Sequence, residues 1–221
     1  MTSQMNFEQA RLNMIEQQIR PWEVLDQTVL DLLQLVHRED FVPEEFRQLA
    51  LADITIPLAN EQVMMTPKLE ARLLQALDIQ TSDKILEVGT GSGYLTALLA
   101  KLGSQVESID IFEDFTNSAK KVLATYDLDN TRLETRDFFQ DREAGKVYDV
   151  VVITGSMPSM DSSLNELLTV GGRLFVIVGE SPVMEARLIR RVSEAEWQEE
   201  SLFETELPPL VGVEVKSEFE F

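Results

Sequence analysis

The 221-residue sequence predicts an α/β fold with a mostly parallel sheet of seven strands. Short apolar runs alternate along residues 84–179 with patterns of helical period, and such alternation is typical of parallel sheets. One run, residues 148–153, is almost uninterrupted in apolar and β-branched residues, which indicates a central strand covered on both faces. With 44% hydrophobic residues, the chain is long enough to bury a full core.

Residues 1–80 are predicted to form a mostly helical extension, and residues 81–221 one core unit that carries the sheet. Apolar residues at helical spacing indicate two helices in the extension. The first ends at Pro21 and has on one face Leu12, Ile15 and Ile19. The second has an apolar stripe made of Val29, Leu32, Leu33 and Val36.

The stretch between residues 40 and 67 is irregular, with prolines at positions 43, 57 and 67. Such a segment beside a ligand site is typical of a lid or a substrate-binding loop. Thr66 and Pro67 have the residue types of a helix N-cap and of the first helical position. We therefore expect a helix to begin there, with a stripe made of Leu69, Leu73 and Leu77.

A strand, a glycine turn and a helix follow one another at residues 84–102. Without side chains at Gly89, Gly91 and Gly93, the backbone can contact a ligand at the carboxyl end of the strand. The spacing does not fit a dinucleotide fingerprint, because position 94 is tyrosine, and the Gly-Lys-Ser/Thr ending of a phosphate loop is absent. The carboxylate of Glu87 would repel a pyrophosphate, so it favours a cationic or amino-bearing ligand.

The next two predicted strands end near side chains that suit a nucleoside. Residues 105–110 end in Asp110, about 20 residues after the turn, which is the spacing of a carboxylate that binds ribose hydroxyls. A helix-terminal or loop acid is the alternative for Asp110. Residues 131–135 precede Asp137 and Phe138, which we expect to meet an adenine amino group and ring. A plain core position is the alternative for Phe138.

Three further strands complete the predicted sheet. A turn at Gly171 and Gly172 introduces residues 173–179, and residues 185–192 and 199–215 supply the last two strands. Pro208 and Pro209 interrupt the final strand, which indicates an edge position or a bulge. Glutamates crowd this end of the chain, and we interpret them as the solvated face of edge strands, with a surface for basic partners as the alternative.

Composition excludes several classes of function. The formal net charge is −20, and no basic stripe with interleaved aromatic residues offsets it, so we expect no nucleic-acid partner. There is no cysteine, and His37, which suits a helix end, is the single histidine, so we expect no metal site. Neither a membrane span nor a secretory signal is recognisable, and we expect a cytoplasmic protein.

The pattern Glu-x-Gly-x-Gly-x-Gly at residues 87–93 resembles the first motif of class I S-adenosylmethionine methyltransferases. Two further phrases are more specific: Met-Ile-Glu-Gln-Gln-Ile-Arg at residues 14–20 and Val-His-Arg-Glu-Asp-Phe-Val-Pro at residues 36–43. They resemble the amino-terminal helices of protein-L-isoaspartate O-methyltransferases. The resemblance continues at residues 56–58, 62–67, 87–95, 136–137, 171–179 and 207–212.

The resemblance implies a Rossmann-like class I methyltransferase fold, with helices on both faces of the sheet. It implies S-adenosyl-L-methionine as the cofactor, which leaves as S-adenosylhomocysteine. The implied reaction is O-methylation of isoaspartyl carboxylates in damaged proteins or peptides, a repair step, by a monomer or weak dimer. The residues expected at the cofactor are Gln62, Met64, Glu87, Gly89, Thr90, Gly91, Ser92, Gly93, Tyr94, Asp110, Ile111, Asp137, Phe138 and Thr154.

One loop departs from the family pattern. The family's substrate loop reads close to Gln-Thr-Ile-Ser-x-Pro, with a serine that faces the methyl-transfer site, and Met65 stands in the serine's place here. Thr66 could supply a hydroxyl to this catalytic position, although an N-cap role is preferred for it. The family's Thr-Ala-Ala-Pro after the fourth strand is likewise Thr-Gly-Ser-Met-Pro at residues 154–158.

A methionine-lined acceptor site would be more apolar and more adaptable. Two alternatives to the isoaspartyl reaction therefore stay open. One is an S-adenosylmethionine-dependent methyltransferase with another small carboxylate or hydroxyl acceptor. The other is a non-catalytic S-adenosylmethionine-binding protein.

Overall fold

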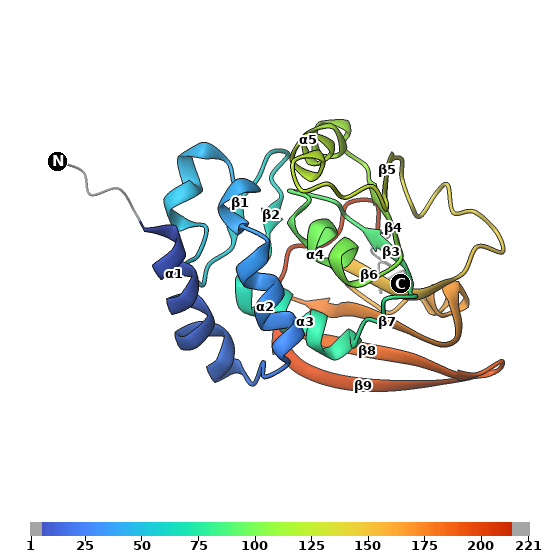
Figure 1. Cartoon of the computed structure of the whole chain (residues 1–221). Helices are drawn as coiled ribbons and strands as arrows, with labels where there is room; N and C mark the ends of the chain where they lie inside the picture. The colour runs from blue at the N-terminus through green and yellow to red at the C-terminus, as the bar shows by residue number, and fades with distance from the viewer. Residues whose placement is uncertain (1–5, 214–221) are drawn as a thin grey trace.

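The computed structural model describes residues 6–213, and a seven-stranded sheet forms its centre (Figure 1). The strand order is β5-β4-β3-β6-β7-β8-β9. The five strands from β5 to β7 in this order are parallel, whereas β8 and β9 are antiparallel to their neighbours. Their bounds are β3 Lys84–Val88, β4 Gln105–Asp110, β5 Thr131–Thr135, β6 Tyr148–Met157, β7 Leu168–Glu180, β8 Val183–Ser193 and β9 Glu196–Thr205. The predicted mostly parallel sheet of seven strands is confirmed.

The order of the strands reverses between β3 and β6. From β3 the chain passes through α4 (Tyr94–Leu102) to β4 and then through α5 (Glu113–Ala124) to β5, moving to one side. β6 then pairs with the other side of β3, with Val88 opposite Ile153. In open α/β sheets ligands bind beyond the carboxyl ends of the strands at such a switch point. The glycine turn after β3 lies at this position.

The strands divide their side chains between two hydrophobic clusters. Val150–Ile153 of β6 is fully buried, with alternate residues in different clusters, which confirms the predicted central strand. The α-helices α2 to α5 contribute to the first cluster, and the 3₁₀ helix η5 (Ser162–Leu167) contributes to the second. Among the described residues, the second face is covered by η5 and irregular segments, so the predicted helices on both faces are α-helices on the first face and a 3₁₀ helix on the second.

The first helix of the extension changes its pitch. α1 (Phe7–Met14) continues as the π-helical η1 (Ile15–Ile19) and ends in the 3₁₀ helix η2 (Arg20–Trp22), which contains Pro21. Ile15 and Ile19 are buried as predicted, but Leu12 is 41% exposed, so its predicted place in the stripe is wrong. Arg11, Met14 and Ile15 are buried and fall at i, i+3 and i+4, so they define the inner face of the helix, and Leu12 lies outside it.

The rest of the extension follows the predicted pattern. The four predicted stripe residues are all buried: Val29, Leu32 and Leu33 in α2 (Gln27–Leu35) and Val36 at its C-cap. His37 follows the C-cap and is exposed. The irregular stretch contains the 3₁₀ helices η3 (Arg38–Asp40) and η4 (Glu44–Leu49) and a short hairpin of β1 (Ile56–Pro57) and β2 (Val63–Met64). α3 (Pro67–Leu77) begins at the Thr66 N-cap, whose hydroxyl accepts a hydrogen bond from the Leu69 amide at 3.4 Å.

The last strand is shorter than predicted. β9 ends at Thr205, so the predicted strand over residues 199–215 is wrong at residues 206–213, and residues 214–215 lie outside the described part of the chain. Proline lacks the amide that a strand pairing needs, and Pro208 and Pro209 instead lie in a segment that runs beside the end of β6. The Ser156 amide donates to the Pro208 carbonyl at 3.0 Å, and the Leu210 amide donates to the Ser156 carbonyl at 2.9 Å.

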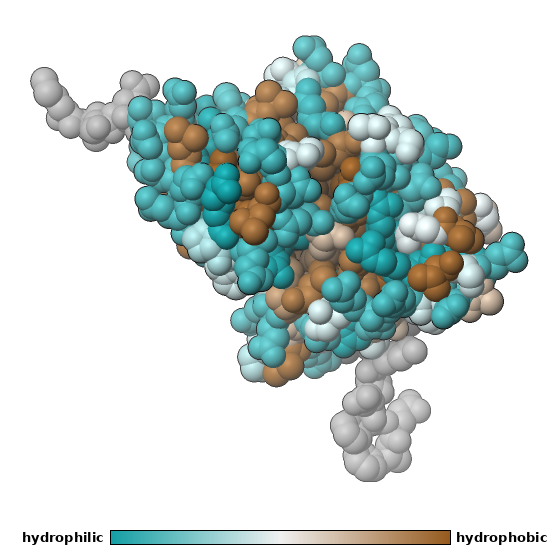
Figure 2. Space-filling view, turned by 60° about the horizontal axis from the view of Figure 1, so that its bottom comes forward, coloured by the Kyte–Doolittle hydropathy of each residue, from teal (hydrophilic) through white to brown (hydrophobic). Residues whose placement is uncertain are grey.

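The acidic residues of the edge strand are solvated. Glu196, Glu199, Glu200 and Glu204 of β9 are exposed, as the interpretation of an edge face expects. The later acids at positions 214, 218 and 220 lie outside the described residues. The face of the molecule in Figure 2 is mostly hydrophilic, with hydrophobic residues in separate groups. Within residues 6–213, no helix has the length and apolar character needed to cross a membrane.

Candidate active site

The three glycines of the turn after β3 all have positive φ, but they serve different purposes. A Cβ on Gly89 would lie 2.0 Å from the Thr154 hydroxyl, and a Cβ on Gly93 would lie 2.7 Å from the Ala119 Cβ. Both glycines are therefore required for packing of the protein against itself. A Cβ on Gly91 would meet only a Leu58 methyl at 3.6 Å, so Gly91 borders open space that a ligand can enter.

Asp110, at the end of β4, is tied to this turn. One carboxylate oxygen accepts a hydrogen bond from the Gly91 amide at 2.9 Å, and the other accepts from the Phe112 amide at 2.9 Å. Burial raises the pKa of Asp110, although these two amides act in the opposite direction. The side chain thus links the ends of β3 and β4 at the switch point.

Glu87 is fully buried in the middle of a polar cluster. One carboxyl oxygen accepts hydrogen bonds from the Thr96 hydroxyl at 2.5 Å and the Ser108 hydroxyl at 2.6 Å. The other oxygen is buried and has no partner among the described residues. Burial raises the pKa of Glu87 to about 8. An unpartnered buried oxygen at a ligand cavity fits a group that supplies a hydrogen bond, such as an amino group.

These residues surround one open cavity at the carboxyl ends of the central strands. Its walls come from the turn after β3, the ends of β4 and β6, the loop after β5 and the β2–α3 loop. The cavity brings together these sequence-predicted residues: Gln62, Met64, Met65, Glu87, Gly89, Thr90, Gly91, Ser92, Asp110, Ile111, Asp137, Phe138 and Thr154.

Three predicted residues do not line the cavity. Thr66 caps α3, and Gly93 packs against Ala119 of α5. The Tyr94 ring is buried beside Phe41, with ring centroids 5.5 Å apart, and under the guanidinium of Arg38 at 5.0 Å. The motif thus identifies the turn correctly, but the side chain at its end points toward the amino-terminal extension.

The loop after β5 is built around Asp137. Its carboxylate accepts from the backbone amides of Phe139 at 3.0 Å and Gln140 at 3.2 Å, so it stabilises the turn that presents Phe138. Phe138 is buried, its ring lies edge-on to that of Phe139, and the guanidinium of Arg142 covers it at 5.0 Å. Phe138 is therefore part of the core and of the cavity wall at the same time.

Sequence reasoning missed part of the wall. The cavity is also lined by Glu70 of α3, Arg136 and Phe139 after β5, and by Leu207, Pro208, Leu210 and Val211. The last four fall within the resemblance at residues 207–212, which was the available signal for them. Glu70 is buried and paired with Arg38, and burial raises its pKa to about 7 although Arg38 lowers it.

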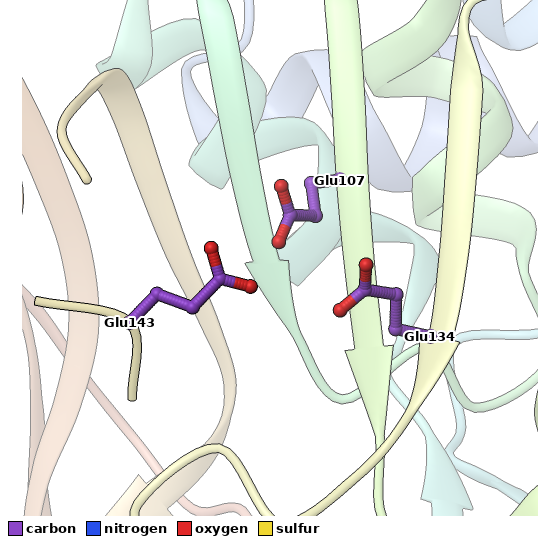
Figure 3. A group of neighbouring side chains, drawn as sticks. All are labelled: Glu107, Glu134 and Glu143. Atoms are coloured by element: carbon purple, nitrogen blue, oxygen red, sulfur yellow. The ribbon is translucent and has the colours of Figure 1, made fainter. Parts of the chain in front are cut away.

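Three glutamates outside the cavity lie close together. The carboxylates of Glu107, Glu134 and Glu143 face one another within 4.8 Å (Figure 3). Lys146 lies 2.6 Å from Glu107 and 3.5 Å from Glu143, and Arg136 lies 2.9 Å from Glu134. Because each carboxylate has a cationic partner, ion pairs account for the group, and we assign no metal site to it.

A Rossmann-like sheet with a glycine turn at its switch point, an acid at the end of the next strand and a cavity beside both is the arrangement of class I S-adenosylmethionine-dependent methyltransferases. The profile of one family, described as protein-L-isoaspartate(D-aspartate) O-methyltransferase, matches residues 9–215. The chain belongs to the protein-L-isoaspartate O-methyltransferase family.

Curated relatives agree with this membership. A protein-L-isoaspartate O-methyltransferase of Rhodopseudomonas palustris is 34% identical over 202 residues, which cover 91% of this chain and 93% of the relative. Protein-L-isoaspartate O-methyltransferase 2 of Pelobacter propionicus is 32% identical over 210 residues, which cover 95% and 93%. The function and the cofactor predicted from the resemblance are confirmed at the level of the family, whose enzymes depend on S-adenosylmethionine.

Two solved structures share the fold over most of the chain. One from Plasmodium falciparum, described as a protein-L-isoaspartate O-methyltransferase with S-adenosyl-L-homocysteine, has a TM-score of 0.77 at 18% identity and covers 94% of this chain and 99% of its own. Another, described as a protein-L-isoaspartate O-methyltransferase, has a TM-score of 0.76 at 19% identity and covers 93% and 66%. These likenesses confirm the predicted Rossmann-like methyltransferase fold.

Proposed function

We propose that this chain methylates isoaspartyl carboxylates of damaged proteins with S-adenosylmethionine bound in the cavity after β3. The observation that carries the assignment of the cavity is the hydrogen bond between Asp110 and the Gly91 amide at 2.9 Å. It holds a carboxylate beside a turn whose middle glycine borders open space. This pairing suits a nucleoside with an amino-acid tail and does not suit a phosphate.

In this proposal the amino-acid end of the cofactor lies along residues 89–92, with the free oxygen of Glu87 near its amino group. Asp110 and Ile111 bind the ribose, Asp137 and Phe138 bind the adenine, and Gln62, Met64 and Thr154 complete the wall. Gly93 and Tyr94 shape the turn from behind. The bound cofactor supplies an activated methyl group.

The acceptor needs little chemical help from the protein. A carboxylate is already ionised at pH 7, so the site needs no general base. The task of the protein is to hold the acceptor oxygen about 3–3.5 Å from the methyl carbon and to exclude water. Met64 and Met65 are both buried and give this side of the cavity an apolar wall.

A matched pair of peptides tests the proposal. One peptide carries an isoaspartyl residue and its twin carries a normal aspartyl residue at the same position. We expect methyl ester on the isoaspartyl peptide alone, measured by mass spectrometry. S-Adenosylhomocysteine binding without ester on either peptide would overturn the isoaspartyl assignment while leaving the cofactor site intact.

A second candidate is methylation of another small carboxylate or hydroxyl acceptor. Met65, buried at the position of the family's serine, favours it, because a thioether cannot orient the acceptor as a hydroxyl does. Transfer of labelled methyl to a panel of small carboxylates, exceeding transfer to the isoaspartyl peptide, would select this candidate.

The proposal also covers the partners, oligomeric state, cellular location and domain division of the enzyme. We propose that nucleic acid is not a substrate, because the net charge is −20. A salt-dependent gel shift at submicromolar protein would contradict this. A monomer or weak dimer, a cytoplasmic location and a division of the chain near residue 80 are proposed as well. Sedimentation, cell fractionation and limited proteolysis test these three in turn.

A further inference from the structure

We propose that Arg38 is a positioning residue, which fixes the substrate loop against the cofactor side of the cavity. The structural role of Arg38 does not depend on the proposed function, whereas its expected effect on kcat/KM rests on that function. The Arg38 side chain is 1% exposed. Its guanidinium donates hydrogen bonds to the Met65 carbonyl and, at 2.9 Å, to the Ala50 carbonyl, and it forms an ion pair with Glu70.

The partners of Arg38 lie on both sides of the site. Met65 and Glu70 line the cavity from the substrate loop and from α3. Tyr94, whose ring centroid lies 5.0 Å from the guanidinium carbon, is the first residue of α4 and follows the glycine turn directly. A single side chain of the amino-terminal extension therefore spans from the acceptor loop to the turn that is proposed to hold the cofactor.

Arginine is suited to this place for a physical reason. Its guanidinium is planar and offers five donors in a fixed fork, so one residue can hold two carbonyls and a carboxylate at set angles. Lysine has one ammonium on a flexible stem and cannot reproduce this geometry. Since the bond from Arg38 is made to the backbone of Met65, it fixes the loop whatever side chain stands at position 65.

Removal of Arg38 alone would leave the Glu70 carboxyl buried without its partner, and that would destabilise the fold regardless of any positioning role. The test variant is therefore the double substitution Arg38→Met with Glu70→Gln. The chain offers a matched control in Arg11 and Glu39, a second buried pair in the same extension. Arg11→Met with Glu39→Gln removes a comparable ion pair that has no bond to the substrate loop.

The first measurement is the backbone amide hydrogen exchange of residues 62–69, and it requires no knowledge of the methyl acceptor. We expect exchange to rise at least about tenfold in the Arg38/Glu70 variant and to stay near wild type in the control. Arg38→Lys, which retains a cation for Glu70, should also show faster exchange. Equal exchange in the test and control variants would overturn the proposal.

The second measurement is kinetic. Loss of positioning should lower kcat/KM for the isoaspartyl peptide about 10²-fold in the Arg38/Glu70 variant. In Arg38→Lys, which leaves the cavity residue Glu70 unchanged, kcat/KM should also fall while the Kd for S-adenosylhomocysteine changes less than about twofold. An equal loss of cofactor affinity would mean that Arg38 supports the whole fold, and the proposal would be wrong. If the wild type methylates no isoaspartyl peptide, the proposed function is wrong. The role of Arg38 is then still tested by the exchange of residues 62–69 and by the Kd for S-adenosylhomocysteine.

Discussion

The carboxylate of Asp110 accepts a hydrogen bond from the backbone amide of Gly91 at 2.9 Å. This bond joins the end of β4 to the turn after β3, across the point where the strand order of the sheet reverses. The two residues are 19 positions apart in sequence, yet the conformation of each depends on the other. Asp110 needs the turn in a conformation with positive φ, and the turn needs an acceptor for its amide.

Replacement of Asp110 by alanine should weaken S-adenosylmethionine binding at least about tenfold, since charge-assisted hydrogen bonds contribute about 1.5–3 kcal/mol each. Calorimetry measures the affinity. Asp114→Ala is the matched control, because this aspartate is exposed on α5 and, among the residues that the structure describes, accepts from Asn60 alone. A loss below about twofold for Asp110→Ala would favour its interpretation as a loop acid.

Gly91→Val should abolish cofactor binding and leave the protein folded, because its side chain would enter the cavity and meet few protein atoms. The control is Gly171→Val, which places the same residue at φ +87 with nothing within 4 Å. Both variants place valine at a positive φ, +50 at position 91 and +87 at position 171, so the control accounts for backbone strain. Unchanged affinity for S-adenosylhomocysteine in Gly91→Val would refute the placement of the ligand.

Glu87 should make the protein less stable as the pH rises. Burial raises its pKa from 4.5 to about 8, so the folded state keeps a proton that the unfolded chain has lost. Its contribution is complete below pH 4.5 and is lost progressively up to about pH 8. Glu87→Gln, which is never charged, should flatten the fall in urea midpoint across this window. Part of the fall in urea midpoint with pH should remain in this variant, because Glu70, with a pKa of about 7, titrates in the same window. An unaltered slope in the Gln variant would contradict the prediction.

Met65→Ser should raise turnover of an isoaspartyl peptide without a change in S-adenosylmethionine affinity. Loss of one oriented donor in comparable sites costs about 10²–10³ in rate, so restoring a hydroxyl should recover part of that factor. Met65 is buried in the cavity wall, where a serine side chain also fits. Steady-state kinetics with both proteins provide the comparison. If wild type and variant are both inactive, the isoaspartyl assignment fails.

Thr66→Ala separates the two roles considered for this residue. Its hydroxyl already accepts from the Leu69 amide, so the substitution should lower the free energy of unfolding by about 1 kcal/mol. Turnover at saturating substrate should not change. A large loss of kcat with unchanged stability would show that the hydroxyl acts on the acceptor instead.

Local patterns were sufficient for most of the sheet. Residues 105–110 and 131–135 were predicted with the bounds that β4 and β5 have, because even a strand that is only half-buried, as β5 is, leaves a signal within a few residues. The π-helical turn at Ile15–Ile19 leaves no such signal. Its two buried residues, Ile15 and Ile19, pack in the first cluster among residues that lie far away in sequence.

The candidate site was predictable where a sequence motif determines the backbone conformation. It was not predictable where tertiary packing determines the orientation of a side chain. The spacing of Gly89 and Gly91 indicated the turn, but the same motif did not reveal that Tyr94 points toward Arg38. Arg136 and Leu207 were also missed as wall residues. Leu207 reaches the cavity through the contacts of residues 207–210 with Ser156, a pairing of segments about fifty residues apart.

That last wall has a consequence during synthesis of the protein. Leu207, Leu210 and Val211 line the cavity, and they follow every strand of the sheet along the chain. During synthesis these residues are added only after all seven strands of the sheet have been made. The strands can therefore begin to pair before the pocket has its last wall, and a ligand is enclosed only after residues 207–210 have docked beside the end of β6.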